Sequence, residues 1–188
     1  MRRSAEQTRL RILDAAYGLF WRQGFLRVSM DEIAASACIT KRALYQHFRS
    51  KDELMAAVLG YASDLAIKRL RDFRRPAANG TEFIDSYFTL LGDWGARPKY
   101  SGGGFTRVAV ELADLRGHPA RAIARKHKLA VEKWLAEELA GTGVSSASDR
   151  AREVMLLTEG AMALMLIHGN QSWARAAARA ARILIQNR

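Results

Sequence analysis

The chain has 188 residues, 49% of them hydrophobic, a formal net charge of +11 and a single cysteine. This length suffices to bury a hydrophobic core in one extended domain or in two small ones. A single cysteine excludes an intramolecular disulfide and a zinc site built on several cysteines. The basic charge favours a polyanionic partner, either a nucleic acid or an anionic membrane surface.

The positive charge is concentrated towards the N-terminal part. Residues 1–75 carry 15 Lys and Arg against 8 Asp and Glu, whereas residues 76–188 carry 15 against 11. A membrane-resident protein is disfavoured, because the most apolar run, residues 154–167, is too short to span a bilayer and contains Glu159. The basic N-terminal residues are not followed by the apolar segment of a signal peptide, so we expect a cytoplasmic protein.

The first predicted helix covers residues 6–23. Its apolar residues recur at the spacing of one helix face, at Ile12, Ala16, Leu19 and Phe20. Gly24 favours the end of this helix, since glycine adopts the left-handed backbone of a C-terminal cap without a steric penalty. Phe25 and Val28 then return to the core formed by that face.

Two short helices are predicted next, in the stretch SMDEIAASACITKRALYQHF. Ser29 and Glu32 have the spacing of a capping box, which starts a helix at about Met30. Thr40 is a suitable N-cap for a second helix, after a break at residues 38–39. The apolar residues fall on one face of each helix: Ile33, Ala34 and Ala37, then Leu44 and Phe48. Two short helices that share an apolar core across a tight turn are typical of a helix-turn-helix.

The polar face of the second short helix carries side chains suited to DNA. Lys41 and Arg42 lie in its first turn, where a recognition helix contacts base edges, and a cation there suits the O6 and N7 acceptors of guanine. The residues better placed for phosphate oxygens are Tyr45, His47 and Lys51. Gln46 lies on the same polar surface, and the Thr40 hydroxyl serves as a cap, as a phosphate contact or as both. A solvated polar face without DNA contacts is the alternative.

The N-terminal residues up to Leu54 resemble the DNA-binding domain of TetR-family transcriptional regulators. The resemblance rests on three stretches in the same order and spacing: TRLRILDAAYGLFWRQGF, VSMDEIAASACIT and KRALYQHFRSKDEL. It implies an all-α homodimer with a helix-turn-helix DNA-binding domain at residues 1–50 and a helical effector-binding and dimerisation domain at residues 51–188. The family usually has glycine at the position of Cys38, in keeping with a left-handed backbone there.

The rest of the chain is predicted to be helical as well, with about nine helices in total and no strands. Ser50 and Glu53 repeat the capping device and start a long helix that continues to about Arg74. Residues 76–80 form the next break. The further helices are expected at residues 83–94, 105–115, 120–139, 149–168 and 172–186. The resemblance implies that this long helix connects the effector-binding domain to the DNA-binding domain. We expect that a bound effector moves it and so changes the spacing of the two DNA-binding domains of a dimer.

The last two segments, residues 149–168 and 172–186, predict how the protein pairs. Glycines and alanines interrupt their apolar residues, and small side chains let helix axes approach closely. A four-helix interface between two subunits fits this pattern, and burial within one subunit fits it equally. The resemblance favours the homodimer, in which two recognition helices read a palindromic operator.

Apolar and aromatic residues of the body form a candidate effector pocket, whose ligand the sequence does not identify. The candidate contacts are Phe88, Leu91, Trp94, Phe105, Val108, Glu111, Leu112, His127, Trp134, Glu159 and Met162. Ordinary core packing is the alternative for most of them. A buried carboxylate needs a cationic partner, and for Glu159 an internal partner is favoured over a ligand. His127 shares a helix face with Val131 and is favoured as a core histidine.

An enzyme is the rival class of protein. No glycine-rich phosphate loop is present, the four histidines lack the spacing of a metal site, and we expect no catalytic residue, metal or cofactor. A second rival is a helical protein-interaction module without specific DNA recognition.

Cys38 is either a redox-active thiol or, as we favour, a small residue that fills a turn. We expect a sequence-specific DNA-binding transcriptional regulator, and we favour a ligand-responsive homodimeric repressor among such regulators.

Overall fold

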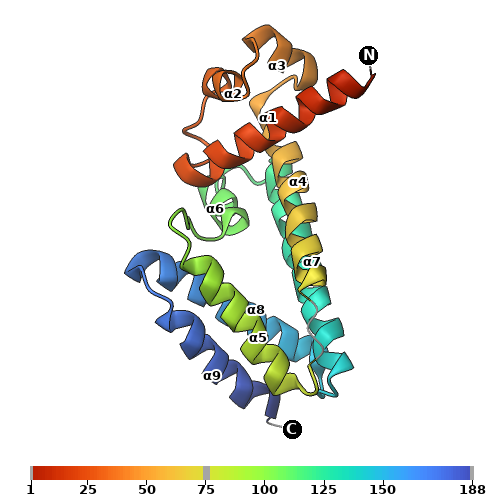
Figure 1. The fold of residues 1–188 in the computed structure, drawn as a ribbon, viewed down its shortest axis with the longest axis vertical. Coiled ribbons are helices and arrows are strands. Elements are labelled where there is room, and N and C mark those ends of the chain that lie inside the picture. The colour runs from red at the N-terminus through yellow and green to blue at the C-terminus, as the bar shows by residue number, and fades with distance from the viewer. Residues whose placement is uncertain (1, 74–76, 187–188) are drawn as a thin grey trace. The chain divides into compact units, whose positions relative to one another are not determined.

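The structure is a computed structural model that describes residues 2–73 and 77–186 (Figure 1). Within these residues it contains nine α-helices and no strand, which confirms the all-α prediction. The helices are α1 (Arg2–Gln23), α2 (Met30–Ser36), α3 (Lys41–His47), α4 (Lys51–Asp72), α5 (Gly80–Gly95), α6 (Gly104–Glu111), α7 (Pro119–Gly141), α8 (Ala147–His168) and α9 (Ser172–Gln186). The predicted helix end at Arg74 and the predicted break at Pro76 lie outside the described residues. No helix in the described ranges is long and apolar enough to cross a membrane.

Two compact units make up the fold. Unit 1 consists of Met1–Arg69 and Gly104–His127, and unit 2 consists of Leu70–Gly103 and Lys128–Arg188. Both units are therefore discontinuous in sequence, and α6 with the first part of α7 belongs to the same unit as α1, α2 and α3. The predicted domains at residues 1–50 and 51–188 divide the chain by role rather than by contacts, and that division stays a prediction.

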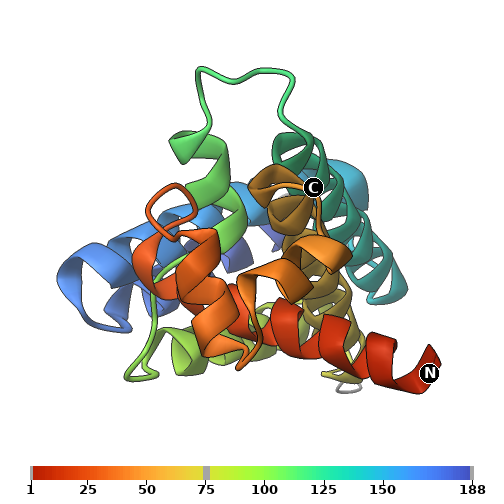
Figure 2. The same ribbon diagram turned by 90° about the horizontal axis from the view of Figure 1, so that it is seen from above.

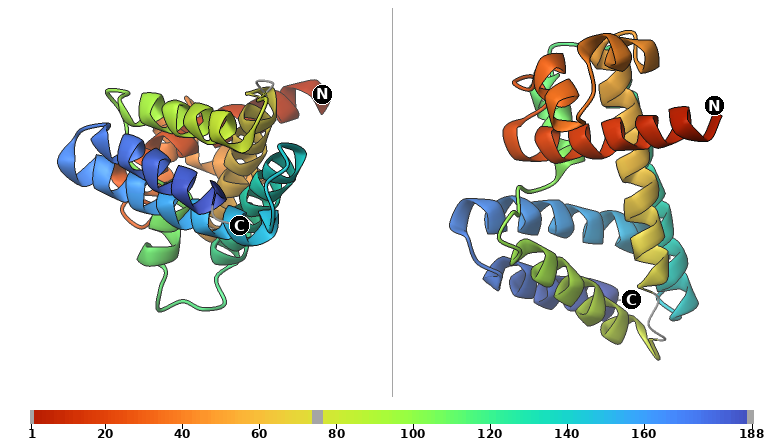
Figure 3. Two further views of the ribbon diagram at one scale, coloured as in Figure 1. Left: turned by 90° about the horizontal axis from the view of Figure 1, so that it is seen from below. Right: turned by 45° about the horizontal axis from the view of Figure 1, so that its top comes forward.

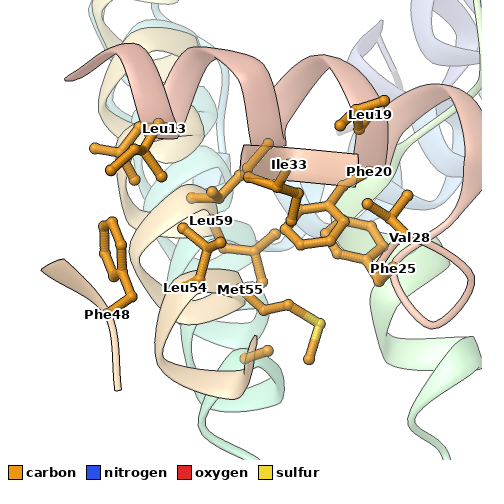
Figure 4. Close-up of a cluster of buried hydrophobic side chains, with 14 of the residues drawn as sticks. Leu13, Leu19, Phe20, Phe25, Val28, Ile33, Phe48, Leu54, Met55 and Leu59 are labelled. Atoms are coloured by element: carbon orange, nitrogen blue, oxygen red, sulfur yellow. The ribbon is translucent and has the colours of Figure 1, made fainter. Parts of the chain in front are cut away.

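Unit 1 has one continuous hydrophobic core, to which α1, the α1–α2 turn, α2, the end of α3 and α4 all contribute. The close-up in Figure 4 labels the following side chains of this core: Leu13, Leu19, Phe20, Phe25, Val28, Ile33, Phe48, Leu54, Met55 and Leu59. The rings of Phe20 and Phe25 stack with their centroids 5.2 Å apart. Burial of each large apolar side chain contributes roughly 1.5–3 kcal/mol. The core therefore fixes how α2 and α3 rest on α1.

The connections of unit 1 differ in length. Residues 37–40 join α2 to α3 in a short turn, and Figure 2 shows both helices together with this turn. Residues 112–118 join α6 to α7 in a longer arch, which stands out from the helix ends in the same view. The middle of this arch, residues 113–117, is exposed.

Unit 2 is built around α5, α8 and α9, which pack side by side (Figure 3). A Cβ atom added at Gly92 of α5 would lie 3.5 Å from the Cβ of Ala174 in α9, so these two backbones approach closely. The buried residues of α9 are Ala174, Ala177, Ala178 and Ala181. One alanine-rich face of α9 therefore packs within the subunit, as the second of the two sequence interpretations expected.

Candidate nucleic-acid interface

The start of α2 is held by a capping box. The Ser29 hydroxyl oxygen accepts a hydrogen bond from the Glu32 backbone N–H (3.2 Å), and the Glu32 carboxylate accepts one from the Ser29 backbone N–H (2.7 Å). The bonds that the backbone N–H and the hydroxyl group of Ser29 donate to this carboxylate lower the pKa of Glu32, so the cap stays ionised at neutral pH. The predicted capping box and the predicted helix start at Met30 are confirmed.

α2 ends in a left-handed turn at Cys38, whose φ is 53°. The Ile39 N–H donates to the Ala34 carbonyl (3.0 Å), and the Cys38 N–H donates to the Ala35 carbonyl (3.1 Å). This pair of bonds is a Schellman motif, which places a left-handed residue directly after the helix. The left-handed backbone that the resemblance implied is confirmed. It costs an L-residue other than glycine roughly 1–2 kcal/mol.

α3 turns one face to the core and the other to solvent. The Thr40 hydroxyl oxygen accepts a hydrogen bond from the Ala43 N–H (3.1 Å) and caps the helix. Leu44 and Phe48 are fully buried. The exposed residues of the helix include Lys41, Arg42, Tyr45 and Gln46, while His47 is half-buried. α3 thus presents two cations, a phenol and an amide on its exposed surface.

Lys41 is tied to α2 across the turn. Its Nζ lies 2.9 Å from a carboxylate oxygen of Asp31, and both side chains are exposed. The hydrogen bond to Asp31 raises the pKa of Lys41, so the ammonium group keeps its charge at neutral pH. Exposed ion pairs stabilise proteins little. Lys41 can therefore exchange Asp31 for another acceptor at small cost.

Arg9 of α1 holds the end of α3. Its Nη1 donates to the His47 carbonyl (3.4 Å), and its guanidinium carbon lies 4.3 Å from the centroid of the Phe48 ring. A cation at a helix C-terminus is favoured by the helix dipole. We did not predict this role of Arg9 from the sequence, because its partner His47 is 38 positions away.

Lys51 differs from the other predicted phosphate contacts. Its Nζ donates to the Leu26 carbonyl (2.7 Å) in the turn between α1 and α2. Partial burial lowers the pKa of Lys51. One of the three ammonium N–H groups is used in this bond. Lys51 therefore has a contact inside unit 1, and its phosphate contact stays a prediction.

Glu111, a predicted effector contact, lies in unit 1 beside the same turn. Its carboxylate accepts hydrogen bonds from the backbone N–H groups of Phe25 (2.8 Å) and Leu26 (2.9 Å) and from Nε of Arg107 (2.7 Å). Arg107 was not predicted from the sequence. No local sequence pattern predicts that Glu111 and Arg107 contact this turn, because Glu111 and Leu26 are 85 positions apart.

The predicted effector contacts fall into two groups, one in each unit. Besides Glu111, the members in unit 1 are Phe105, Val108, Leu112 and His127. The members in unit 2 are Phe88, Leu91, Trp94, Trp134, Glu159 and Met162. Neither unit contains all of the predicted effector contacts, and the effector site stays a prediction.

Two residues of that set have internal partners, as the sequence interpretation favoured. The His127 ring stacks on Phe105 with the centroids 3.6 Å apart, and its Nδ1 lies 3.0 Å from the Ser63 hydroxyl oxygen. Glu159 forms an ion pair with Lys128. Both residues therefore have structural contacts within their own unit.

The helix-turn-helix geometry of α2 and α3 agrees with the known proteins that this chain resembles. The family model of bacterial regulatory proteins, tetR family, matches residues 12–58, which run from α1 into α4. The HTH-type transcriptional regulator UidR of Escherichia coli (strain K12) is 39% identical over 85 residues, which are 45% of this chain and 41% of that protein. The match thus spans less than half the length of this curated relative.

Solved structures match along nearly the whole chain. A putative TetR transcriptional regulator from Streptomyces avermitilis is 28% identical, with 93% of this chain and 98% of that chain covered and a TM-score of 0.75. A TetR-family transcriptional regulator from Streptomyces coelicolor, 22% identical, has the same fold over 97% of this chain and 96% of its own, with a TM-score of 0.82. The N-terminal family model and the full-length fold agree: residues 12–58 belong to the TetR family of bacterial regulatory proteins, and the chain as a whole has the fold of solved TetR regulators.

Proposed function

We propose that the protein is a sequence-specific DNA-binding transcriptional regulator and not an enzyme. The observation that carries the proposal is the exposed surface of α3 with Lys41, Arg42, Tyr45 and Gln46. The charge supports it, because unit 1 contains 17 Lys and Arg against 9 Asp and Glu. Such an excess attracts duplex DNA before specific contacts form.

In this proposal the first turn of α3 reads bases in the major groove. Lys41 and Arg42 match the O6 and N7 acceptors of guanine, and Gln46 matches the N6 and N7 pair of adenine. The residues that contact phosphates are Thr40, Tyr45, His47 and Lys51. Thr40 and Lys51 suit this role despite their internal bonds, since a hydroxyl that accepts still donates its proton and an ammonium group has three donors.

We propose that the protein is a homodimer formed through α8 and α9. Large apolar side chains are exposed on these helices: Leu156 and Ile167 (71% exposed each) on α8 and Ile183 (62%) on α9. Exposed apolar patches mark surfaces that a partner covers. A twofold-symmetric interface buries the same residues from both subunits. The two recognition helices then read the two halves of a palindromic operator.

We propose that the dimer is a repressor released from DNA by a small-molecule effector, and that it acts on DNA in the cytoplasm. The candidate effector contacts are those of unit 2. Among them the Trp134 indole N–H is buried and has no hydrogen-bond acceptor among the described residues, so a ligand carbonyl or carboxylate would satisfy it. An effector that prefers the conformation unable to bind DNA shifts the population away from the operator.

The test is selection of binding sites from a random duplex library with the purified full-length protein at near-physiological salt. The expected result is an inverted repeat that binds two subunits, with an affinity that falls steeply as salt rises. Enrichment of no sequence, with weak binding that disappears at moderate salt, contradicts the proposal. That result supports the rival proposal of a helical protein-interaction module.

A further inference from the structure

The turn between α1 and α2 leaves backbone N–H groups without helical partners. α1 ends at Gln23, the Gly24 N–H still donates to the Phe20 carbonyl (2.9 Å), and Gly24 has a left-handed φ of 102°. The amides of Phe25 and Leu26 then point out of the helix. Buried or partly buried amides need acceptors. These acceptors come from α6.

Glu111, the last residue of α6, supplies them with one carboxylate oxygen. Its Oε2 accepts both amides, at 2.8 Å from Phe25 and 2.9 Å from Leu26, while its Oε1 accepts from Nε of Arg107 at 2.7 Å. Arg107 in turn donates from Nη1 to the Trp21 carbonyl of α1 (3.1 Å). Hydrogen bonds that involve an ionised group are about twice as strong as neutral ones. The end of α1 and the turn are therefore held by two charged side chains of α6.

The packing around these bonds leaves little room for α6 to shift. A Cβ atom added at Gly24 would lie 2.7 Å from Nη2 of Arg107 and 2.9 Å from Oε1 of Glu111. A Cβ atom added at Gly104, the first residue of α6, would lie 2.2 Å from the Trp21 indole ring. Contacts below 3.0 Å force neighbouring atoms to move. Glycine at both positions thus permits a close fit of α6 against α1.

The same turn is held from a second direction by the start of α4. The Nζ of Lys51 donates to the Leu26 carbonyl (2.7 Å), so Leu26 is bonded through its N–H to α6 and through its carbonyl to α4. α4 follows α3 after only three residues, and the turn leads directly into the Ser29 cap of α2. The positions of both short helices are thereby linked to the position of the turn.

We infer that Glu111 is a positioning residue for DNA binding: it fixes the turn before α2 and, through it, the orientation of α2 and α3. The orientation of the helix-turn-helix then depends on α6, which lies outside the residues 12–58 that match the family model. The inference rests on the proposed DNA-binding function. Glu111 itself contacts no base or phosphate in it.

The test uses the full-length variant Glu111→Gln, which keeps the size of the side chain and removes its negative charge. Electrostatics alone predicts equal or tighter DNA binding, because the protein becomes more positive. Positioning predicts weaker specific binding, because a neutral amide is a poorer acceptor for two N–H groups and for Arg107. The two explanations therefore have opposite signs. Asp114→Asn, at an exposed position of the arch after α6, is the control for charge.

Two duplexes measure the effect: the sequence selected from the random library and a shuffled duplex of equal length. For Glu111→Gln we expect affinity for the selected duplex to fall about tenfold, and affinity for the shuffled duplex to stay within about twofold. A second readout is amide hydrogen exchange of the peptide over residues 20–28, which should become faster in this variant alone. Asp114→Asn should match the wild type in both readouts.

The inference is overturned if Glu111→Gln binds the selected duplex as the wild type does, or if it loses affinity for both duplexes equally. If Glu111→Gln does not fold, Glu111→Asp takes its place, since it keeps the charge and shortens the side chain by one methylene group, which withdraws the carboxylate from the two amides; unchanged affinity of that variant for the selected duplex overturns the inference as well. A wild-type protein that fails to distinguish the two duplexes contradicts the proposed function itself, and this outcome is seen before any variant is made.

Discussion

The two compact units differ in what they expose. Unit 1 carries 17 Lys and Arg against 9 Asp and Glu, and its helix α3 exposes Lys41 and Arg42. Unit 2 is more evenly charged, with 13 against 10, and its helices α8 and α9 expose Leu156, Ile167 and Ile183. A cationic surface gains from contact with a polyanion, whereas an apolar surface gains by leaving water. This difference is the reason for proposing DNA contact for unit 1 and subunit contact for unit 2.

The largest expected effect is on the charged surface of unit 1. The double substitution Lys41→Ala/Arg42→Ala should abolish sequence preference, because each good base contact contributes about 1–3 kcal/mol and a dimer makes it twice. Specific and shuffled duplexes should then bind with equal affinity in a fluorescence anisotropy titration. Arg125→Ala/Lys126→Ala removes the same charge from exposed positions on α7 and should keep the preference. A preference retained by the α3 variant rules out base contacts by these two residues.

The apolar surface of unit 2 provides the second test. Ile167→Asp and Ile183→Asp should each raise the dimer dissociation constant by at least about a hundredfold, since a central interface residue contributes about 2–4 kcal/mol and occurs twice in a symmetric dimer. Analytical ultracentrifugation measures the change. Leu129→Asp, at a 52% exposed position on α7, is the control and should remain dimeric. Dimers of unchanged affinity in both α8 and α9 variants would place the interface elsewhere.

A third and smaller expected effect is a loss of folding stability at alkaline pH, and its cause lies in unit 2. Burial raises the pKa of Tyr87 from 10.0 to about 12, while its hydrogen bond with Thr158 acts in the opposite direction. Between these two values the unfolded chain has lost the phenolic proton and the folded chain retains it, so stability is complete below pH 10 and falls as pH rises towards 12. The loss should reach about 2–3 kcal/mol.

Thermal unfolding of Tyr87→Phe over this range checks the expectation. The variant should lose less stability than the wild type between pH 10 and 12, because it has no phenolic proton to lose. Tyr100→Phe is the graded comparison: burial also raises the pKa of Tyr100 to about 12, but this side chain is only half-buried and water screens its effect. Identical alkaline profiles for Tyr87→Phe and the wild type would show that another group controls the loss.

The local features of unit 1 were predictable because their causes lie within a few residues of one another. Ser29 with Glu32 and Thr40 with Ala43 are three positions apart, so sequence spacing alone identifies the helix starts. The second predicted capping box differs in one detail. Ser50 accepts the Glu53 N–H, but the Glu53 carboxylate takes the Arg49 N–H rather than that of Ser50.

The contacts between distant segments were not predictable in this way. Glu111 is a polar residue in an apolar helix, and this pattern fits an effector contact as well as an internal acceptor. Only the folded chain brings it to the amides of Phe25 and Leu26. Lys51 illustrates the same limit, since a cation near the start of α4 looks like a phosphate contact until its bond to the Leu26 carbonyl is known.

The smallest expected effect compares the two left-handed residues other than glycine in the described ranges, Cys38 in unit 1 and Ser146 in unit 2, with φ of 53° and 52°. Replacing either by glycine relieves about 1–2 kcal/mol of backbone strain. Glycine also adds freedom to the unfolded chain, which offsets about 0.5–1 kcal/mol. The net gain should be about 0.5–1 kcal/mol for each variant, visible as a melting temperature raised by a few degrees.

Their effects on DNA binding should differ. Cys38→Gly changes the turn between α2 and α3, whose Schellman bonds use backbone atoms only and survive the substitution. Affinity for the selected duplex should therefore stay within about twofold, and Ser146→Gly should leave it unchanged. A loss of affinity in Cys38→Gly together with a higher melting temperature would mean that the cysteine side chain itself orients α3. That result would make the turn more than a strained connection, because strain relief alone can only stabilise the geometry already present.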